Sequence, residues 1–206
     1  MLDSEFFRRW MSATAVSVDR EAASLTALDS PIGDADHGSN MQRGFLAVVT
    51  TLDKEPPATP GAVLVLAGRQ LISTVGGASG PLYGTLLRRT GKALGDADEV
   101  SEADLAAALR TGVDAVATLG GAAPGDKTML DALLPAVDAL GDGGSFAAAR
   151  AAADAGAEAT TPMLARKGRA SYLGERSIGH QDPGATSSAL LIAALSDAAG
   201  SGASGE

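Results

Sequence analysis

Apolar residues recur every three or four positions along most of the chain, the spacing that gathers side chains on one face of an α-helix. Thr59 followed by Pro60, and Ser101 followed by Asp104, are typical helix starts, because such side chains accept hydrogen bonds from free backbone amides. The pattern predicts eight helices, at residues of about 4–28, 38–52, 60–75, 81–95, 101–116, 126–140, 145–165 and 185–199.

One stretch, from Arg166 to Gly184, has no helical periodicity. Irregular segments longer than about 12–15 residues inside a compact domain are usually functional or disordered. Because this segment contains the apolar residues Tyr172, Leu173 and Ile178, we expect an ordered functional loop.

Composition favours an all-α fold. The chain has 206 residues, of which 42 are alanine, the residue with the highest helix propensity, and only 3% are aromatic. No internal repeat or linker divides the sequence, so we expect one helical domain over residues 1–200. The Gly/Ser-rich residues 201–206 are expected to form a flexible tail.

Charge and residue usage exclude several classes of protein. Lysine and arginine number 16 against 25 acidic residues, a net charge of −9, whereas nucleic-acid binders need a basic stripe. The N-terminus lacks a secretory signal, and no apolar run approaches the roughly 20 residues of a membrane span. The absence of cysteine excludes disulfides and Cys nucleophiles. These features predict a cytoplasmic protein with neither nucleic-acid nor membrane partners.

Three carboxylates, Asp29, Asp34 and Asp36, lie within eight residues on a turn broken by Pro and Gly. Such a cluster repels itself without a cation, and its hard oxygen atoms suit Mg²⁺ or Ca²⁺. An EF-hand fails, because Phe45 occupies the position that requires a bidentate Glu. The alternative is a solvated acidic turn in which one Asp caps the next helix.

Two Gly-rich turns precede predicted helices, at residues 76–81 and 120–129. Small residues let backbone amides approach an anion at a helix N-terminus, although a plain helix–helix turn explains them equally well. The second turn is not a P-loop, because Asp126 interrupts the Gly-Lys-Thr triplet and no strand precedes it. Asp126 is instead a candidate helix cap, and Met129 is either core or a surface on which a base stacks.

Basic residues concentrate in the long loop, which carries Arg166, Lys167, Arg169, Arg176 and His180. Arg176 could neutralise a phosphate or pair with a local carboxylate, and His180 is either a base or a structural side chain. All four special segments lie in connections between helices, where a helical bundle presents its functional groups. Together they predict a nucleotide–Mg²⁺ site at one end.

The same segments carry a resemblance to a known family. Gly33–Met41 (GDADHGSNM), Gly76–Gly84 (GGASGPLYG), Pro124–Asp131 (PGDKTMLD) and Arg169–Gly184 (RASYLGERSIGHQDPG) resemble, in this order, the nucleotide-binding L subunits of dihydroxyacetone kinases. The resemblance implies an eight-helix antiparallel up-and-down barrel with the nucleotide at one end.

The resemblance also implies ligands for individual residues. Asp29, Asp34 and Asp36 would hold two Mg²⁺ ions that bridge the phosphates of ADP or ATP, and Arg176 would stabilise phosphate during transfer. Further nucleotide-binding positions are His37, Gly38, Ser39, Asn40, Ala78, Ser79, Gly121, Met129, Arg176, Asp182, Pro183 and Gly184.

Because the chain carries only this unit, the resemblance implies the phosphotransferase-system type of kinase. There ADP stays bound, a phosphohistidine protein rephosphorylates it in place, and dihydroxyacetone sits on a partner subunit. The long loop is the expected docking edge, and a homodimer is also allowed. Two alternatives stay open: a paralogous subunit of another ketose or polyol kinase, and a non-enzymatic nucleotide sensor.

Overall fold

The computed structural model describes residues 1–202, which form eight α-helices, one 3₁₀ helix and two very short strands. In chain order the elements are β1 (Leu2–Asp3), α1 (Ser4–Asp29), α2 (His37–Lys54), α3 (Pro60–Thr74), α4 (Ser79–Leu94), β2 (Glu99–Val100), α5 (Glu102–Gly120), α6 (Leu130–Gly141), α7 (Phe146–Ala159), η1 (Arg169–Ser177) and α8 (Pro183–Gly202). The expected all-α fold is confirmed.

The helix starts read from the sequence are confirmed where capping side chains were recognised. Thr59 accepts a hydrogen bond from the Ala62 amide, with Pro60 at the first helical position of α3. Ser101 and Asp104 form the reciprocal capping box of α5. These side chains satisfy amides that have no partner within the helix, so they fix where each helix begins.

Other boundaries differ from the expectation. α6 begins at Leu130 rather than at Asp126, because Gly125 and Lys127 take positive φ values of 85° and 62° that no helix accommodates. α7 ends at Ala159, short of Pro162, and the long loop contains η1. α8 continues through Gly202, two residues into the expected tail, while residues 203–206 lie outside the described part of the chain.

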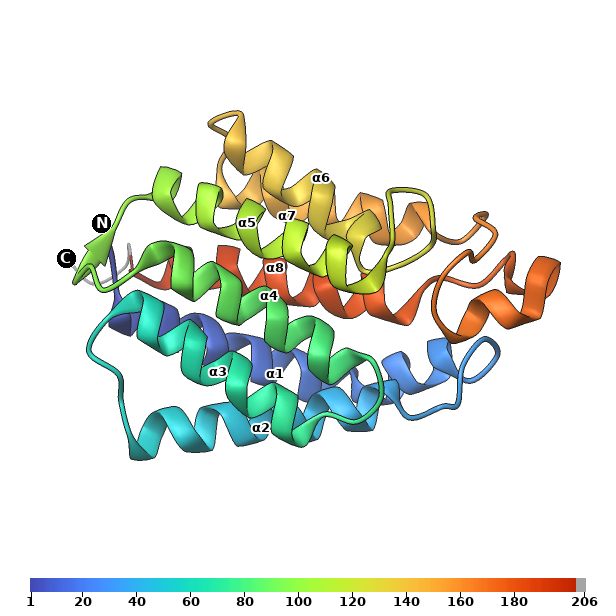
Figure 1. The fold of residues 1–206 in the computed structure, drawn as a ribbon, viewed down its shortest axis with the longest axis horizontal. Helices are drawn as coiled ribbons and strands as arrows, with labels where there is room; N and C mark the ends of the chain where they lie inside the picture. The colour runs from blue at the N-terminus through green and yellow to red at the C-terminus, as the bar shows by residue number, and fades with distance from the viewer. Residues whose placement is uncertain (203–206) are drawn as a thin grey trace.

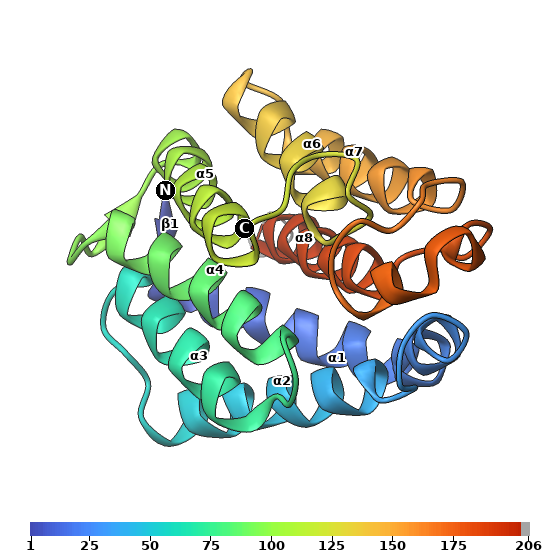
Figure 2. The same ribbon diagram turned by 45° about the vertical axis from the view of Figure 1, so that its right-hand side comes forward.

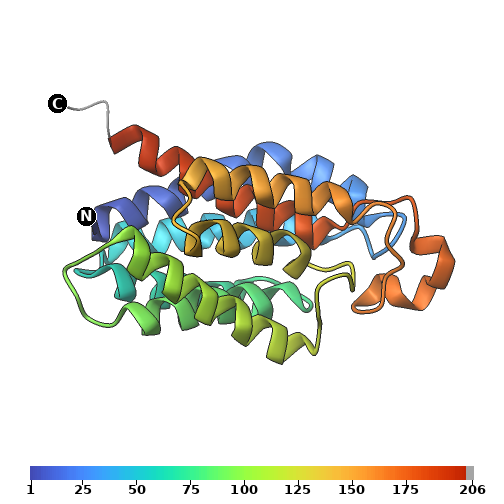
Figure 3. The same ribbon diagram turned by 90° about the horizontal axis from the view of Figure 1, so that it is seen from above.

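The helices run antiparallel to their neighbours in sequence and close into a ring. Each helix packs against the next one, and α8 packs against both α7 and α1, so the first and last helices are side by side (Figures 1 and 3). The Trp10 indole N–H of α1 donates to the Leu191 carbonyl of α8, 2.8 Å away. Buried residues from all eight helices form one apolar core.

Antiparallel order decides where the connections lie. The α1–α2, α3–α4, α5–α6 and α7–α8 connections gather at one end of the bundle, on the right of Figure 1. The termini, the β1–β2 pair and the α2–α3 connection lie at the other end. All four segments singled out in the sequence are therefore at the same end.

No helix in the described residues is both long enough and apolar enough to span a membrane.

Candidate functional site

Figure 2 turns this end of the bundle toward the viewer. A cavity of about 420 Å³ is lined by residues of these four connections. Ligand pockets of proteins usually have volumes between about 300 and 1,000 Å³, so this one can hold a small molecule. One part of its wall is apolar, with Pro81, Leu82, Val116, Leu119, Met129 and Leu130. The lining also includes polar and charged residues, with Asp29, His37, Ser79, Lys127, Lys167, Arg169 and Asp182.

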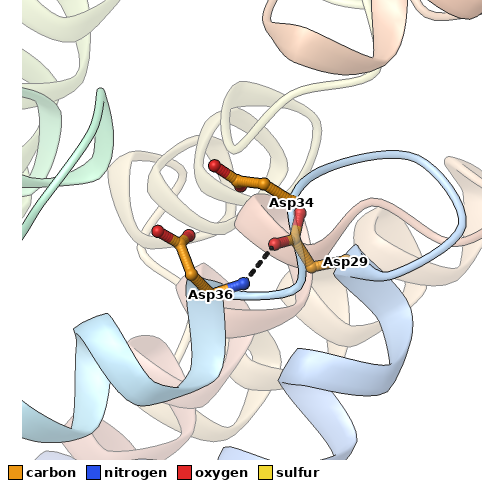
Figure 4. Close-up of side chains that lie close together, drawn as sticks. All are labelled: Asp29, Asp34 and Asp36. Atoms are coloured by element: carbon orange, nitrogen blue, oxygen red, sulfur yellow. Dashed lines mark hydrogen bonds between the residues drawn. The ribbon is translucent and has the colours of Figure 1, made fainter.

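Asp29, Asp34 and Asp36 come together on the α1–α2 connection (Figure 4). One oxygen from each carboxylate lies within 4.8 Å of the others, although Asp29 is buried and the other two are exposed. This convergence is the geometry that a hard divalent cation requires, because such ions bind several carboxylate oxygens at once. The donor set therefore fits Mg²⁺.

The backbone holds Asp29 in place. Its Oδ2 atom accepts hydrogen bonds from the amides of Asp36 at 3.0 Å and His37 at 3.2 Å. An alanine at Gly33 would place its Cβ 1.9 Å from Asp29 Oδ1, so only glycine fits against this carboxylate. Between the other two acids, Ala35 takes a positive φ of 59°. A strained non-glycine residue at such a turn is typical of functional sites.

The alternative interpretation, an acidic turn in which one Asp caps the next helix, accounts for only one of the three aspartates. Asp29, at the end of α1, serves the first amides of α2, whereas Asp36 makes no capping hydrogen bond with its side chain. Asp34 Oδ2 pairs instead with the Arg169 guanidinium at 2.9 Å. Both partners of that pair are substantially exposed, so it contributes little to folding stability. The two exposed carboxylates therefore remain available to a ligand.

The Gly-rich turn before α4 brings a helix N-terminus to the cavity. Ala78, at the N-cap position, and Ser79, the first helical residue, both line the wall. Backbone amides at a helix start are free donors and carry partial positive charge, which favours an anion. The simple-turn explanation does not account for this placement beside the carboxylates.

His37 is a cross-link between helices rather than a free side chain. Its Nε2 atom is 2.8 Å from Ser187 Oγ in α8, and its Nδ1 atom is 3.3 Å from Ser79 Oγ in α4. Burial lowers the pKa of His37, although Asp29 and Asp36 oppose this shift. A neutral imidazole is suited to this position, because it can donate to one hydroxyl and accept from the other.

The chain of hydrogen bonds continues inward to Tyr83, which sequence reasoning missed. The Tyr83 hydroxyl lies 2.7 Å from Ser187 Oγ and 2.8 Å from Ser188 Oγ, and it donates to the Gly184 carbonyl at 3.1 Å. Burial raises the pKa of Tyr83. The network joins the starts of α2, α4 and α8 beneath the cavity, and only the tertiary contacts reveal it.

The other two connections supply the remaining wall. Met129 is buried in the core and lines the cavity, and its role as a surface on which a base stacks stays a prediction. Gly121 ends α5 with a φ of 56°, and its neighbours Gly120 and Ala122 line the cavity in its place. Asp126 does not cap α6 as predicted, because its carboxylate accepts from the Ala123 amide within the turn.

Asp182, Pro183 and Gly184 line the cavity at the start of α8. The Asp182 carboxylate caps this helix by accepting from the Ala185 amide at 2.7 Å. Burial raises the pKa of Asp182 to about 7, while the Ala185 amide and the charge of Lys127 oppose the shift. The sequence signal for this cap, Asp followed by Pro, was present in the chain.

Several predicted site residues lie outside the cavity wall. Gly38 and Asn40 are buried in the first turn of α2, and Ser39 is exposed there and donates to the Asp36 carbonyl. Arg176 is exposed on η1 and does not line the cavity, whereas Lys167 and Arg169 of the same loop do. A count of loop cations could not have distinguished them, because the folded path of the loop determines which of them line the cavity.

The fold and the site define a helical-bundle domain that collects a carboxylate cluster, two helix N-termini and three cationic residues, Lys127, Lys167 and Arg169, around one cavity. Comparison with known proteins identifies the family. A family model described as the DAK2 domain matches residues 31–197, and the chain belongs to this family.

Among relatives, the ADP-binding subunit DhaL of the PEP-dependent dihydroxyacetone kinase of Escherichia coli K12 is 44% identical over 198 residues. The alignment covers 92% of this chain and 94% of that subunit. The ADP-binding subunit of the PTS-dependent dihydroxyacetone kinase of Lactococcus lactis is 37% identical, and 97% of it is covered. The L-erythrulose 1-kinase of Mycolicibacterium smegmatis is 40% identical, but only 33% of its length is covered.

Among solved structures, the dihydroxyacetone kinase of C. freundii in complex with AMP-PNP and Mg²⁺ superposes with a TM-score of 0.75 at 28% identity. The match covers 92% of this chain and 33% of that kinase.

Proposed function

We propose that this chain is the ADP-binding subunit of a phosphoenolpyruvate-dependent dihydroxyacetone kinase. The observation that carries the proposal is the convergence of Asp29, Asp34 and Asp36 beside a cavity of about 420 Å³. Relatives named as such subunits match the chain over nearly their full length. In this role the chain holds the nucleotide, and a partner subunit holds the acceptor sugar.

The three carboxylates would hold two Mg²⁺ ions, which supply charge neutralisation for the phosphates of ADP or ATP. The chain prepares that position through the amides of Asp36 and His37, which orient Asp29, and through the strained turn at Ala35. Phosphoryl transfer depends mainly on positioning and electrostatic stabilisation, so a rigid carboxylate turn contributes directly to the reaction.

The remaining wall suits the rest of a nucleotide. The amides of Ala78 and Ser79 at the start of α4 can donate to phosphate oxygens, and Lys167 and Arg169 add positive charge to the lining of the same cavity. The apolar wall around Leu82 and Met129 matches the flat face of a base. Arg176 is exposed in the isolated chain and does not line the cavity. In this proposal it stabilises phosphate only after the partner subunit has bound.

The site is half of an active centre in this proposal. Dihydroxyacetone is bound on the partner subunit, and a phosphohistidine protein of the phosphotransferase system converts the bound ADP back to ATP. The long loop, with Arg176 and the 90%-exposed Tyr172, is the docking edge for these proteins. A homodimer and residence in the cytoplasm remain predictions of the sequence.

A second acceptor sugar is a specific alternative. Two erythrulose kinases of Mycolicibacterium smegmatis are each 40% identical to the chain, although it spans only about a third of their length. The nucleotide site would be the same in a paralogous kinase, and only the partner subunit would differ. A non-enzymatic nucleotide sensor would also keep the cavity but transfer no phosphoryl group.

Reconstitution of the complete kinase from its subunits distinguishes the dihydroxyacetone kinase, the paralogous kinase and the nucleotide sensor. The chain is mixed with a dihydroxyacetone-binding subunit, the phosphohistidine relay and phosphoenolpyruvate, and triose phosphate is followed by coupled NADH oxidation. We expect no turnover from the chain with ATP and dihydroxyacetone alone, and turnover once the partner subunits are present. Turnover by the chain alone, or product only from erythrulose, contradicts the proposal. Native mass spectrometry of the purified chain tests whether ADP stays bound.

A further inference from the structure

Lys127 is a charged residue held in an unfavourable environment. Its side chain is 1% exposed, and its backbone takes a φ of 62°, a region that non-glycine residues rarely enter. Burial of an ammonium group and a strained backbone each cost free energy. A residue that combines both is held there by the surrounding structure.

Backbone carbonyls satisfy the buried ammonium group. Lys127 Nζ donates to the carbonyl oxygen of Ser177 at 2.7 Å, of Met163 at 3.1 Å and of Thr161 at 3.5 Å. An ammonium group has three N–H donors, so this set uses all of them. Within residues 1–202 Lys127 forms no salt bridge, and burial lowers the pKa of its side chain while Asp182 opposes the shift.

The three carbonyls belong to the two legs of the α7–α8 connection. Thr161 and Met163 lie on the first leg, directly after α7, and Ser177 ends η1 on the second leg. The legs are also joined to each other, since the Gly179 amide donates to the Thr161 carbonyl at 2.8 Å and the Ala165 amide donates to Ser177 Oγ at 2.9 Å. Lys127 enters this junction from the α5–α6 turn.

The part of the loop between the two legs carries the cations of the site. The Arg166 amide bonds to the Asp126 carbonyl at 3.0 Å, which fixes the loop next to Lys127. Immediately beyond this anchor, Lys167 and Arg169 line the cavity, and Arg169 reaches Asp34 at 2.9 Å. The position of both cations therefore depends on the junction around Lys127, a residue that itself also lines the cavity.

We propose that Lys127 is a positioning residue that clamps the two legs of the α7–α8 connection and thereby holds Lys167 and Arg169 at the cavity. The proposal rests on the proposed function, because it makes nucleotide affinity depend on an ammonium group that is committed to three protein carbonyls. A neutral side chain of similar length leaves those carbonyls unpaired and releases the loop.

The test compares Lys127→Met with Lys54→Met, the same chemical change at an exposed lysine at the end of α2. Trypsin cleaves after Arg166, Lys167, Arg169 and Arg176, so the rate of cleavage at these sites measures how firmly the loop is held. In nucleotide-free protein, we expect Lys127→Met to speed cleavage at these four sites at least tenfold. Cleavage at the helical residues Arg110 and Arg150 should stay slow, which a general loss of folding would not permit.

Calorimetry then measures ADP binding with Mg²⁺, at a temperature where circular dichroism shows each variant fully folded. We expect at least a tenfold weaker affinity for Lys127→Met and an unchanged affinity for Lys54→Met. Selective loosening of the loop with wild-type affinity overturns the positioning role. The trypsin experiment uses no nucleotide, so it tests whether Lys127 holds the loop even if the wild-type chain does not bind ADP. Failure of the wild-type chain to bind ADP would contradict the proposed function instead.

Should Lys127→Met fail to fold, reductive methylation of the wild-type protein provides the second measurement. The exposed residues Lys54 and Lys92 should be labelled within minutes, and Lys127 should stay unlabelled until the loop is cleaved or the protein is unfolded. Labelling of Lys127 as fast as Lys92 in the intact protein overturns the clamp.

Discussion

Gly33→Ala tests whether the exact position of one carboxylate controls cation binding, because it changes no charge. The φ of Gly33 lies outside the positive range, so the backbone itself accepts alanine. The added Cβ, however, would lie 1.9 Å from Asp29 Oδ1 and 2.7 Å from Asp29 Cγ. Non-bonded heavy atoms need about 3.5 Å, so the carboxylate must move by more than about 1 Å.

This displacement has a calculable cost. Asp29 Oδ2 accepts from the amides of Asp36 at 3.0 Å and His37 at 3.2 Å, and a shifted carboxylate loses one or both bonds. Hydrogen bonds to charged groups contribute about 1.5–3 kcal/mol each, so we expect the free energy of unfolding to fall by about 1.5–3 kcal/mol for each bond that is lost. A domain of ordinary stability, about 5–15 kcal/mol, remains folded after this loss.

The assay is calorimetric titration with ADP at fixed Mg²⁺ concentrations, with urea unfolding as the measure of stability. We expect Gly33→Ala to weaken Mg²⁺-dependent ADP binding at least tenfold. Gly141→Ala is the matched control, because nothing lies within 4 Å of its added Cβ at the end of α6. Wild-type affinity and Mg²⁺ dependence in Gly33→Ala would refute the inference that Asp29 must hold this position.

Three further predictions follow from individual side chains and from the ligand. Asp36→Asn should change the unfolding free energy by less than about 0.5 kcal/mol, because the side chain is exposed and caps no helix, yet abolish Mg²⁺-dependent ADP binding in calorimetry. Buried Asp182 keeps its proton up to a pKa of about 7, against 3.8 in the unfolded chain. Wild type should therefore lose stability relative to Asp182→Asn as pH rises from about 4 to 7, by at most about 1.4 kcal/mol per pH unit, and parallel urea curves would contradict this. Removal of ADP and Mg²⁺ with EDTA should lower the melting temperature, since a ligand at a thousandfold excess over Kd adds about 4 kcal/mol.

The helices were predictable where local chemistry determines them. The 3.6-residue periodicity and the caps at Thr59 and Ser101 depend on neighbouring residues, and the structure places these starts as expected. The start of α6 was not predicted correctly. Positive φ values at Gly125 and Lys127 delay it, and the Lys127 side chain bonds to carbonyls 34 to 50 residues away. A short-range pattern contains no information about such contacts.

The candidate site shows the same division. The Asp cluster and the Gly-rich turns were visible as local motifs, and antiparallel topology brings them to one end. The Tyr83–Ser187–His37 network was not visible, because its members are separated by about 40 to 150 residues and look like ordinary core or helix positions. The choice between Arg169 and Arg176 as the cavity cation depends on the path of the loop, which the sequence does not specify.

The three aspartates of the cluster are chemically identical, but they differ in burial and in their bonding partners. Asp29 is buried and accepts hydrogen bonds from two backbone amides, so it contributes to the folding of the α1–α2 turn in addition to its proposed role as a cation ligand. Asp34 shares its charge with Arg169, and Asp36 is exposed. A cation that binds here therefore meets one fixed ligand and two adjustable ones. Such a site can accept the metal together with its phosphates without rebuilding the turn, because only the exposed carboxylates need to move.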